Sequence, residues 1–214
     1  EDAALLLRSL GHEVVELDLP LDSEELALAY LTQVAASVAI EVRDTAAKTG
    51  VAPRADRFEL PTWFLKQVGD ELSAAQLQSA RDTFQRLGRN VAAFYEGHNI
   101  DLHLSATMAF PPVRVGELSL NVLQRGALSA LRRASTGRVL RSVLEQMSAD
   151  SLAKTPNTQV FNMTGQPAMN VPLWWNDEGL PIGVQLAGRF GDEKRMFRLA
   201  TQLELARPWA QQMP

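Results

Sequence analysis

Three polar side chains on one short apolar segment could carry out acid–base chemistry. Asp101, His103 and Ser105 occupy alternate positions, so a strand would point all three to the same face. A carboxylate beside an imidazole can orient it for proton transfer. A hydrolase of the Ser-His-Asp type also needs its serine at a sharp strand-to-helix turn, and the chain contains no G-x-S-x-G sequence. We therefore interpret His103 as a partly buried structural residue.

A second pair of patterns suggests lysine-assisted serine chemistry. Residues 151–154 fit S-x-x-K and residues 48–50 fit K-T-G, which are signatures of serine β-lactamases and penicillin-binding proteins. In those enzymes the K-T-G sequence follows the serine, whereas here it precedes the serine. The S-D-N sequence that completes the set is absent from the chain. We reject this interpretation.

Composition excludes several other chemistries. The 214 residues include no cysteine and three histidines, so disulfides, thiolate catalysis and cysteine-type zinc sites are excluded and no metal is expected. No glycine-rich phosphate-binding motif occurs, and we expect no cofactor. The net charge of −4 argues against nucleic acid. Five arginines recur without acids over a helical stretch, which we interpret as a solvated face: 125, 132, 133, 138 and 141.

The chain also gives no sign of a membrane or a secretory route. It has no uninterrupted apolar run of about 18 residues. Its N-terminus lacks the basic and apolar regions of a signal peptide. We predict a cytoplasmic protein without a membrane partner.

The elements that would position these residues read as a mixture of helices and strands. Residues 2–10 predict an amphipathic helix ended by Gly11, and the alternation over 12–19 predicts a strand. A long helix capped by Ser23 should run to Lys48, followed by a connector over residues 50–63. The helix over residues 2–10, the turn at Gly11 and the strand over residues 12–19 together resemble the second half of a βαβ unit whose first strand is missing.

The remaining elements continue the alternation. A capping box at residues 73–76 begins a helix through Phe94, and a short strand follows at 100–104. Residues 118–147 look helical. A strand through Val171, a turn at 176–179 and a strand over 182–186 precede a last helix over 192–206. The inward residues of that helix should be Met196, Phe197, Leu199, Ala200 and Leu203. The pattern predicts an α/β sheet with helical layers.

The last third of the chain carries a long and specific pattern. Residues 158–172 read T-x-x-x-N-x-T-G-x-P-A-x-x-V-P, residues 179–188 read G-L-P-x-G-x-Q-x-x-G, and an acidic helix start follows at 192–193. This pattern resembles the C-terminal hallmark of the amidase signature family. Residues 101–107 resemble the D-x-x-L-T-P-T strand of that family, with Ala106 in place of proline, and Asn170 stands where serine is common. The similarity is greatest to the branch that includes the 6-aminohexanoate cyclic dimer hydrolases.

The resemblance implies a fold and a reaction. The expected fold is the C-terminal portion of the amidase signature α/β fold, a mixed β-sheet flanked by helices. Residues 1–214 would form a single incomplete domain from which the catalytic N-terminal half is absent. The family hydrolyses amides with a Ser–cis-Ser–Lys triad and backbone oxyanion donors. The chain has no two adjacent serines, so we assign no catalytic residue and expect these residues alone to be inactive.

Three residues are predicted to bind substrate. Thr158 and Asn162 are polar and precede a fixed turn, at what should be a strand or loop edge. Phe58, together with Trp63 and Phe64, is predicted to form a lid over the pocket. The expected partners are a small-molecule amide substrate and the missing N-terminal half, with a homodimer as a further possibility. Two alternatives stay open: a truncated, non-catalytic binding or assembly subunit, and a separate α/β domain of unrelated function.

Overall fold

The computed structural model describes residues 1–111, 114–116, 119, 121–131, 142–143 and 157–212. Its contacts divide the chain into two compact units. Unit 1 comprises Glu1–Leu21, Gln85–Pro111 and Ala153–Pro214, and unit 2 comprises Asp22–Phe84 and Pro112–Leu152. The expectation of one incomplete domain over residues 1–214 stays a prediction.

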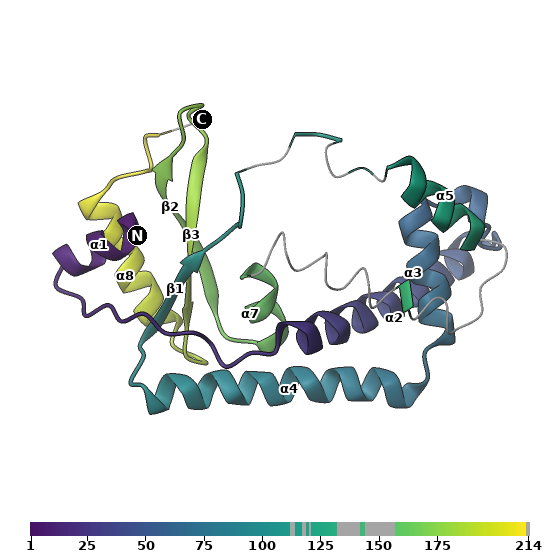
Figure 1. Ribbon diagram of the computed structural model, residues 1–214, viewed down its shortest axis with the longest axis horizontal. Coiled ribbons are helices and arrows are strands. Elements are labelled where there is room, and N and C mark those ends of the chain that lie inside the picture. The colour runs from purple at the N-terminus through teal and green to yellow at the C-terminus, as the bar shows by residue number, and fades with distance from the viewer. Residues whose placement is uncertain (112–113, 117–118, 120, 132–141, 144–156, 213–214) are drawn as a thin grey trace. The chain divides into compact units, whose positions relative to one another are not determined.

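A three-stranded antiparallel sheet forms the centre of unit 1, with strand order β1-β3-β2 (Figure 1). The strands are β1 (Leu102–Ala106), β2 (Ala168–Trp175) and β3 (Pro181–Gly188). Side chains alternate between the two faces of each strand, so the register fixes which residues share a face. The α/β class predicted from the sequence is confirmed, and the part of its sheet that the structure describes is antiparallel.

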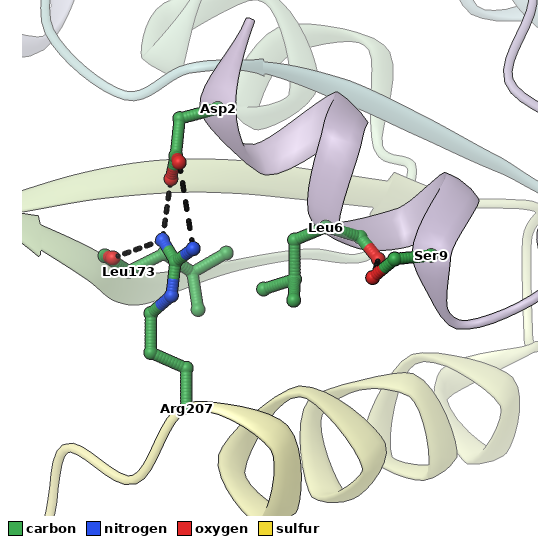
Figure 2. Close-up of polar contacts among 5 residues, drawn as sticks. All are labelled: Asp2, Leu6, Ser9, Leu173 and Arg207. Atoms are coloured by element: carbon green, nitrogen blue, oxygen red, sulfur yellow. Dashed lines mark hydrogen bonds and ion pairs between the residues drawn. The ribbon is translucent and has the colours of Figure 1, made fainter.

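Helices α1 (Asp2–Ser9) and α8 (Glu193–Ala206) cover one face of this sheet. Their apolar side chains pack on the strands in a single core cluster, whose buried members are Ala3, Leu7, Val171, Leu173, Leu186, Leu199 and Leu203. Arg207, just after α8, pairs with Asp2 on α1 and donates to the Leu173 carbonyl oxygen at 2.9 Å (Figure 2). The Arg207 guanidinium lowers the pKa of the Asp2 carboxyl group. One side chain therefore ties two helices to strand β2.

The opposite face of the sheet meets α7 (Thr158–Thr164) and the C-terminal part of α4 (Ala74–Gly97). His103 on β1 lies between two aromatic rings, with ring centroids 6.4 Å from Tyr95 and 5.8 Å from Phe161. Ala187, on the neighbouring strand at the same level, is fully buried. Helices thus cover both faces of the sheet at this level.

Unit 2 is helical in its described part. It contains α2 (Ser23–Thr49), the short 3-10 helix η1 (Ala55–Arg57), α3 (Leu60–Glu71) and α5 (Val122–Leu131), together with the start of α4. Its core cluster joins α2, α3 and α5 through the buried residues Leu31, Ala35, Phe64, Val68 and Leu128. Among the helices that the structure describes, α2 alone is long and apolar enough to cross a membrane, and half of its most apolar window is buried.

The predicted strand over residues 12–19 is wrong. These residues have no regular structure, and the side chains of Val15 and Leu17 are 52% and 40% exposed. Val14 instead packs against the core of unit 1. A strand needs a neighbour to accept its backbone hydrogen bonds, and no strand in the described part of the chain pairs with this segment.

Most of the other predicted elements are confirmed where the structure describes them, with local differences; of the helix predicted over residues 118–147, the described part contains α5, and much of the rest lies outside the described residues. The capping box at α4 forms, because the Gln76 amide N–H donates to Ser73 Oγ at 3.2 Å and the Ser73 amide N–H donates to Gln76 Oε1 at 2.9 Å. Asp22, not Ser23, caps α2 by accepting from the Glu25 amide. Phe197 does not face inward on α8, because its side chain is 65% exposed. Helices α3 and α7 are not anticipated by the sequence pattern.

Candidate functional site

Two of the predicted substrate-binding residues lie one helical turn apart on α7. Thr158 is half-buried and Asn162 is exposed. The Asn162 side-chain amide donates to the Thr158 carbonyl oxygen at 2.8 Å. The sequence pattern predicts a strand or loop edge here, and the structure has a helix in its place. The helix ends where Gly165 adopts the left-handed conformation (φ 88°) and its N–H donates to the Phe161 carbonyl oxygen.

The start of α7 is held by polar contacts to the sheet. Asn157 precedes the helix, and its side-chain amide donates to the Ala106 carbonyl oxygen at 2.8 Å. Its own carbonyl oxygen accepts from Gln185 Nε2 at 3.1 Å. Gln185 Nε2 also lies 3.4 Å from Ser105 Oγ. Asn157 is therefore hydrogen-bonded to Ala106 on β1 and to Gln185 on β3, so the sheet fixes the first turn of α7.

The end of α7 is held by a second set of contacts. Thr164 Oγ donates to the Val160 carbonyl oxygen at 2.9 Å and is also bonded to Gln166. Gln166 Nε2 donates to the Gly88 carbonyl oxygen at 3.1 Å on α4. A Cβ atom at Gly88 would lie 2.6 Å from the Thr164 carbonyl oxygen. The two helices approach so closely that only glycine fits at this point.

A third polar pair lies next to Gln185 on the same face of the sheet. Thr107 Oγ1 donates to Asn170 Oδ1. Gly183 on β3 provides the space for this amide, because a Cβ atom there would lie 2.0 Å from Asn170 Oδ1. Asn170, which departs from the family pattern, is therefore hydrogen-bonded to Thr107 and fits because Gly183 has no side chain.

The Asp101, His103 and Ser105 set does not form a catalytic triad. The Asp101 carboxylate pairs with Arg195 on α8. Burial lowers the pKa of His103, which favours the neutral imidazole. Ser105 Oγ accepts from the Gln185 amide, which is no general base and cannot take a proton from a nucleophile. The predicted partly buried position of His103 is confirmed, and its structural role stays an interpretation.

Tyr95 adds an unusual buried hydroxyl beside His103. Its side chain is 1% exposed, and its Oη has no hydrogen-bond partner among the residues that the structure describes. Burial raises the pKa of this phenol well above its usual value. The pair Tyr95 and His103 is therefore neutral at physiological pH.

The third predicted residue, Phe58, belongs to unit 2. It is half-buried, directly after η1, and its ring centroid lies 5.9 Å from that of Trp63. Lys66 Nζ lies 5.0 Å from the Trp63 ring centroid, within the range of a cation–π contact. Phe64 is 2% exposed in the core of unit 2. Phe64 is therefore a core residue, and its assignment to a lid is wrong.

Several other sequence motifs can be placed. Lys48 and Thr49 form the last residues of α2, with Gly50 in the left-handed conformation after them, which is a helix end. Ser151 and Lys154 lie outside the described residues, as do four of the five clustered arginines. In the described ranges, no three His, Asp or Glu side chains gather in a way that could hold a metal ion.

The residues that anchor α7 are not identified by any motif in the sequence. Asn157, Gln185 and Gln166 supply side-chain hydrogen bonds between separate elements. One signal was available for Gln185, which is a polar residue between Val184 and Leu186 in an apolar strand. The arrangement offers amide groups, which donate and accept hydrogen bonds, in place of acids and bases. Such a set can recognise a neutral polar group and cannot supply a nucleophile.

Comparisons with known proteins identify the family of the chain. The family model described as Amidase matches residues 1–197. AmiB2 of Mycobacterium tuberculosis, which is assigned as an amidase, is 30% identical over 212 residues, covering 99% of this chain and 39% of its own length. A 6-aminohexanoate-cyclic-dimer hydrolase of Pseudomonas sp. (strain NK87) is 26% identical over 213 residues, covering 99% of this chain and 40% of its own.

Solved structures give the same result. The structure of a 6-aminohexanoate cyclic dimer hydrolase is similar with a TM-score of 0.75 at 26% identity, over 97% of this chain and 40% of that one. A second structure of such a hydrolase, complexed with substrate, has a TM-score of 0.74 at 25% identity. The chain therefore spans about 40% of the length of the relatives that it matches.

Proposed function

The chain belongs to the amidase signature family, and on this basis we propose that it forms the non-catalytic part of an amide-bond hydrolase. It would supply one part of the sheet and one wall of the substrate pocket. The observation that carries this proposal is a family match over residues 1–197 in a chain that spans about 40% of its relatives. The anchored α7 provides the polar surface of that wall.

The proposed chemistry needs groups from the rest of the enzyme. In the Ser–cis-Ser–Lys mechanism, a lysine accepts a proton through the bridging serine while the nucleophilic serine attacks the amide carbonyl carbon. The tetrahedral intermediate then collapses, and the amine leaves with the proton that the lysine had accepted. Water hydrolyses the acyl-enzyme ester to the acid and regenerates the serine. Backbone N–H groups stabilise the oxyanion. Since no two serines are adjacent in this chain, we place this triad in a part of the protein outside these 214 residues.

The pocket wall is assigned to α7. Asn162 is exposed and carries both a donor and an acceptor, which match the two polar groups of an amide substrate. Thr158 lies one turn away on the same helix. Phe58, whose ring is tilted against that of Trp63 in unit 2, is a separate proposal for contact with the apolar part of the substrate. The substrate is a small linear or cyclic amide, and the partner is the catalytic N-terminal half.

The proposal is tested with a chimera. The 214-residue chain is joined to the part of the Pseudomonas cyclic-dimer hydrolase that it does not match, and hydrolysis of 6-aminohexanoate cyclic dimer is measured. We expect turnover by the chimera and none by the 214-residue chain alone. In the chimera, Asn162→Ala and Phe58→Ala should raise KM, because both side chains are proposed to contact substrate.

The controls separate the alternatives. The Pseudomonas portion alone should be inactive, which shows that the chain of interest is needed. Amide hydrolysis by the 214-residue chain alone, blocked by an inhibitor that reacts with catalytic serines, would contradict the proposal. A chimera that folds by circular dichroism and stays inactive would favour the other interpretation, a truncated amidase-like subunit for binding or assembly.

A further inference from the structure

A buried glutamine occupies the middle of the sheet in unit 1. Gln185 lies on the central strand β3 and is 5% exposed. Its neighbours across the sheet are Ser105 on β1 and Asn170 on β2, so three polar residues form one row on one face. Its neighbour on the same face, Ala187, is fully buried. An apolar side chain would suit such a position, so the amide needs a reason.

The amide of Gln185 reaches the segment that begins α7. Its Nε2 donates to the Asn157 carbonyl oxygen at 3.1 Å, whereas the contact with Ser105 Oγ is longer, at 3.4 Å. Asn157 is also held through its side chain, which donates to the Ala106 carbonyl oxygen at 2.8 Å. The residue before α7 is therefore bound to β3 through its main chain and to β1 through its side chain.

Asn157 uses its side chain in an unexpected way for its place in the chain. Asparagine before a helix usually accepts a hydrogen bond from an N–H group of the first turn. Asn157 makes no such bond, and its backbone has helical angles (φ −101°, ψ −36°). The side chain that could stabilise the helix end instead fixes the helix to the sheet. This exchange favours position over local helix stability.

We propose that Gln185 is a positioning residue: through Asn157, its buried amide sets the orientation of α7 and thereby the placement of Thr158 and Asn162. The C-terminal end of α7 is fixed independently, because Gln166 donates a hydrogen bond to the Gly88 carbonyl oxygen on α4. With both ends held, the exposed Asn162 keeps one place above the sheet. The role in substrate binding rests on the proposed function, whereas the positioning of α7 does not.

Local hydrogen exchange in the 214-residue chain tests the positioning directly. Gln185→Leu keeps a similar volume and removes the donor to Asn157. We expect the amides of residues 158–164 to exchange about tenfold faster, because the first turn loses its tie to β3. The amides of α8 should change by less than about twofold, because α8 packs on the other face of the sheet.

Three further variants keep the test decisive. Ser105→Ala removes only the longer contact of Gln185 and should leave exchange in α7 unchanged. Gln185→Met removes the same donor with a more flexible side chain and should reproduce the loss of protection if Gln185→Leu does not fold. Asn157→Asp removes the separate bond to the Ala106 carbonyl oxygen. The side-chain amide NMR signals of Asn162 should shift in Gln185→Leu and Asn157→Asp and stay in place in Ser105→Ala.

The same variants give a functional readout in the chimera. Gln185→Leu should raise KM for the cyclic dimer several-fold with a smaller change in kcat, because the residue touches no reacting atom. An inactive chimera would count against the proposed function alone, since the exchange experiment needs no turnover. Uniformly faster exchange through α7, α8 and β2, or unchanged exchange in α7, would overturn the positioning role of Gln185.

Discussion

Burial decides the protonation state of His103. The imidazole lies between Tyr95 and Phe161, and desolvation lowers its pKa below the ordinary value of 6.5. The unfolded chain therefore binds a proton at a higher pH than the folded chain does. Above pH 6.5 the neutral His103 makes its full contribution to the free energy of unfolding. That contribution is lost as the pH falls from 6.5 toward the lower pKa of the folded state.

This predicts a pH-dependent stability that one substitution removes. Wild-type protein should have a lower urea midpoint at pH 5.5 than at pH 7.5, and His103→Phe should have a smaller decrease, because it keeps the aromatic packing without a titrating group. Chemical denaturation at the two pH values measures the difference. His98→Gln leaves His103 in place and is the control, in which the decrease due to His103 should remain.

A second prediction concerns Gly183 and Asn170. Gly183→Ala should lower the free energy of unfolding by about 1 kcal/mol, because the new methyl group displaces the Asn170 amide and breaks its hydrogen bond with Thr107. In an Asn170→Ala background the same change should cost less than about 0.5 kcal/mol. Urea denaturation of the four proteins gives the coupling energy. Equal costs in both backgrounds would show that Gly183 is needed for another reason.

The residues of the site divide into those that a pattern identifies and those that only the fold identifies. Thr158 and Asn162 belong to a long sequence pattern, and the structure places them one turn apart. Gln185 and Asn157 are separated by 28 positions in sequence. Their contact depends on the register of β3 against β1 and on the entry of the chain into α7, which no local pattern encodes.

At the scale of elements, close helix packing in unit 2 depends on one glycine. A Cβ atom at Gly69 on α3 would lie 2.1 Å from the Ala35 carbonyl oxygen on α2 and 2.7 Å from Ala39 Cβ. Backbone cannot move aside as a flexible side chain can. The small residues at this crossing therefore set the distance between α2 and α3.

We predict opposite effects for two glycine-to-alanine changes in helices. Gly69→Ala should destabilise the protein by about 1–3 kcal/mol through overpacking. Gly126→Ala on α5, where nothing lies within 4 Å of the new atom, should stabilise it by about 0.5–1 kcal/mol through helix propensity. Thermal and urea unfolding measure both. A stabilising effect of Gly69→Ala would contradict the described crossing of α2 and α3.

The elements also show where sequence periodicity is reliable. The long amphipathic helices α2, α4 and α8 lie within three residues of their predicted bounds. Residues 12–19 alternate as a strand does and yet have no regular structure, because a strand depends on a neighbour and a helix does not. Helix α7 is short and has no local sequence signal. It is stabilised instead by tertiary contacts at both of its ends.

At the scale of the whole molecule, α4 belongs to both compact units. The boundary between them falls between Phe84 and Gln85, inside the continuous helix Ala74–Gly97. Helix formation is cooperative. Loss of helix in one unit should therefore promote loss of helix in the other, and we expect the two units of the wild-type chain to unfold in one transition.

A proline at the boundary should separate the two transitions. Gln85 is exposed, so Gln85→Pro removes helical hydrogen bonding at a cost of about 3 kcal/mol without disturbing a core side chain. Hydrogen exchange at increasing urea should then show core amides of α2 and of β3 opening at different concentrations. Gln85→Ala is the control and should keep them together. Coincident opening in both variants would contradict the coupling through α4.

The division of the chain has a consequence for its inheritance. Unit 1 is assembled from three separate stretches and unit 2 from two, so the chain passes between them four times. A recombination event that moved one continuous block of coding sequence would carry neither unit by itself. The smallest continuous block that contains all of unit 2, residues 22–152, also contains residues 85–111 of unit 1, and a block that contains all of unit 1 is the whole chain.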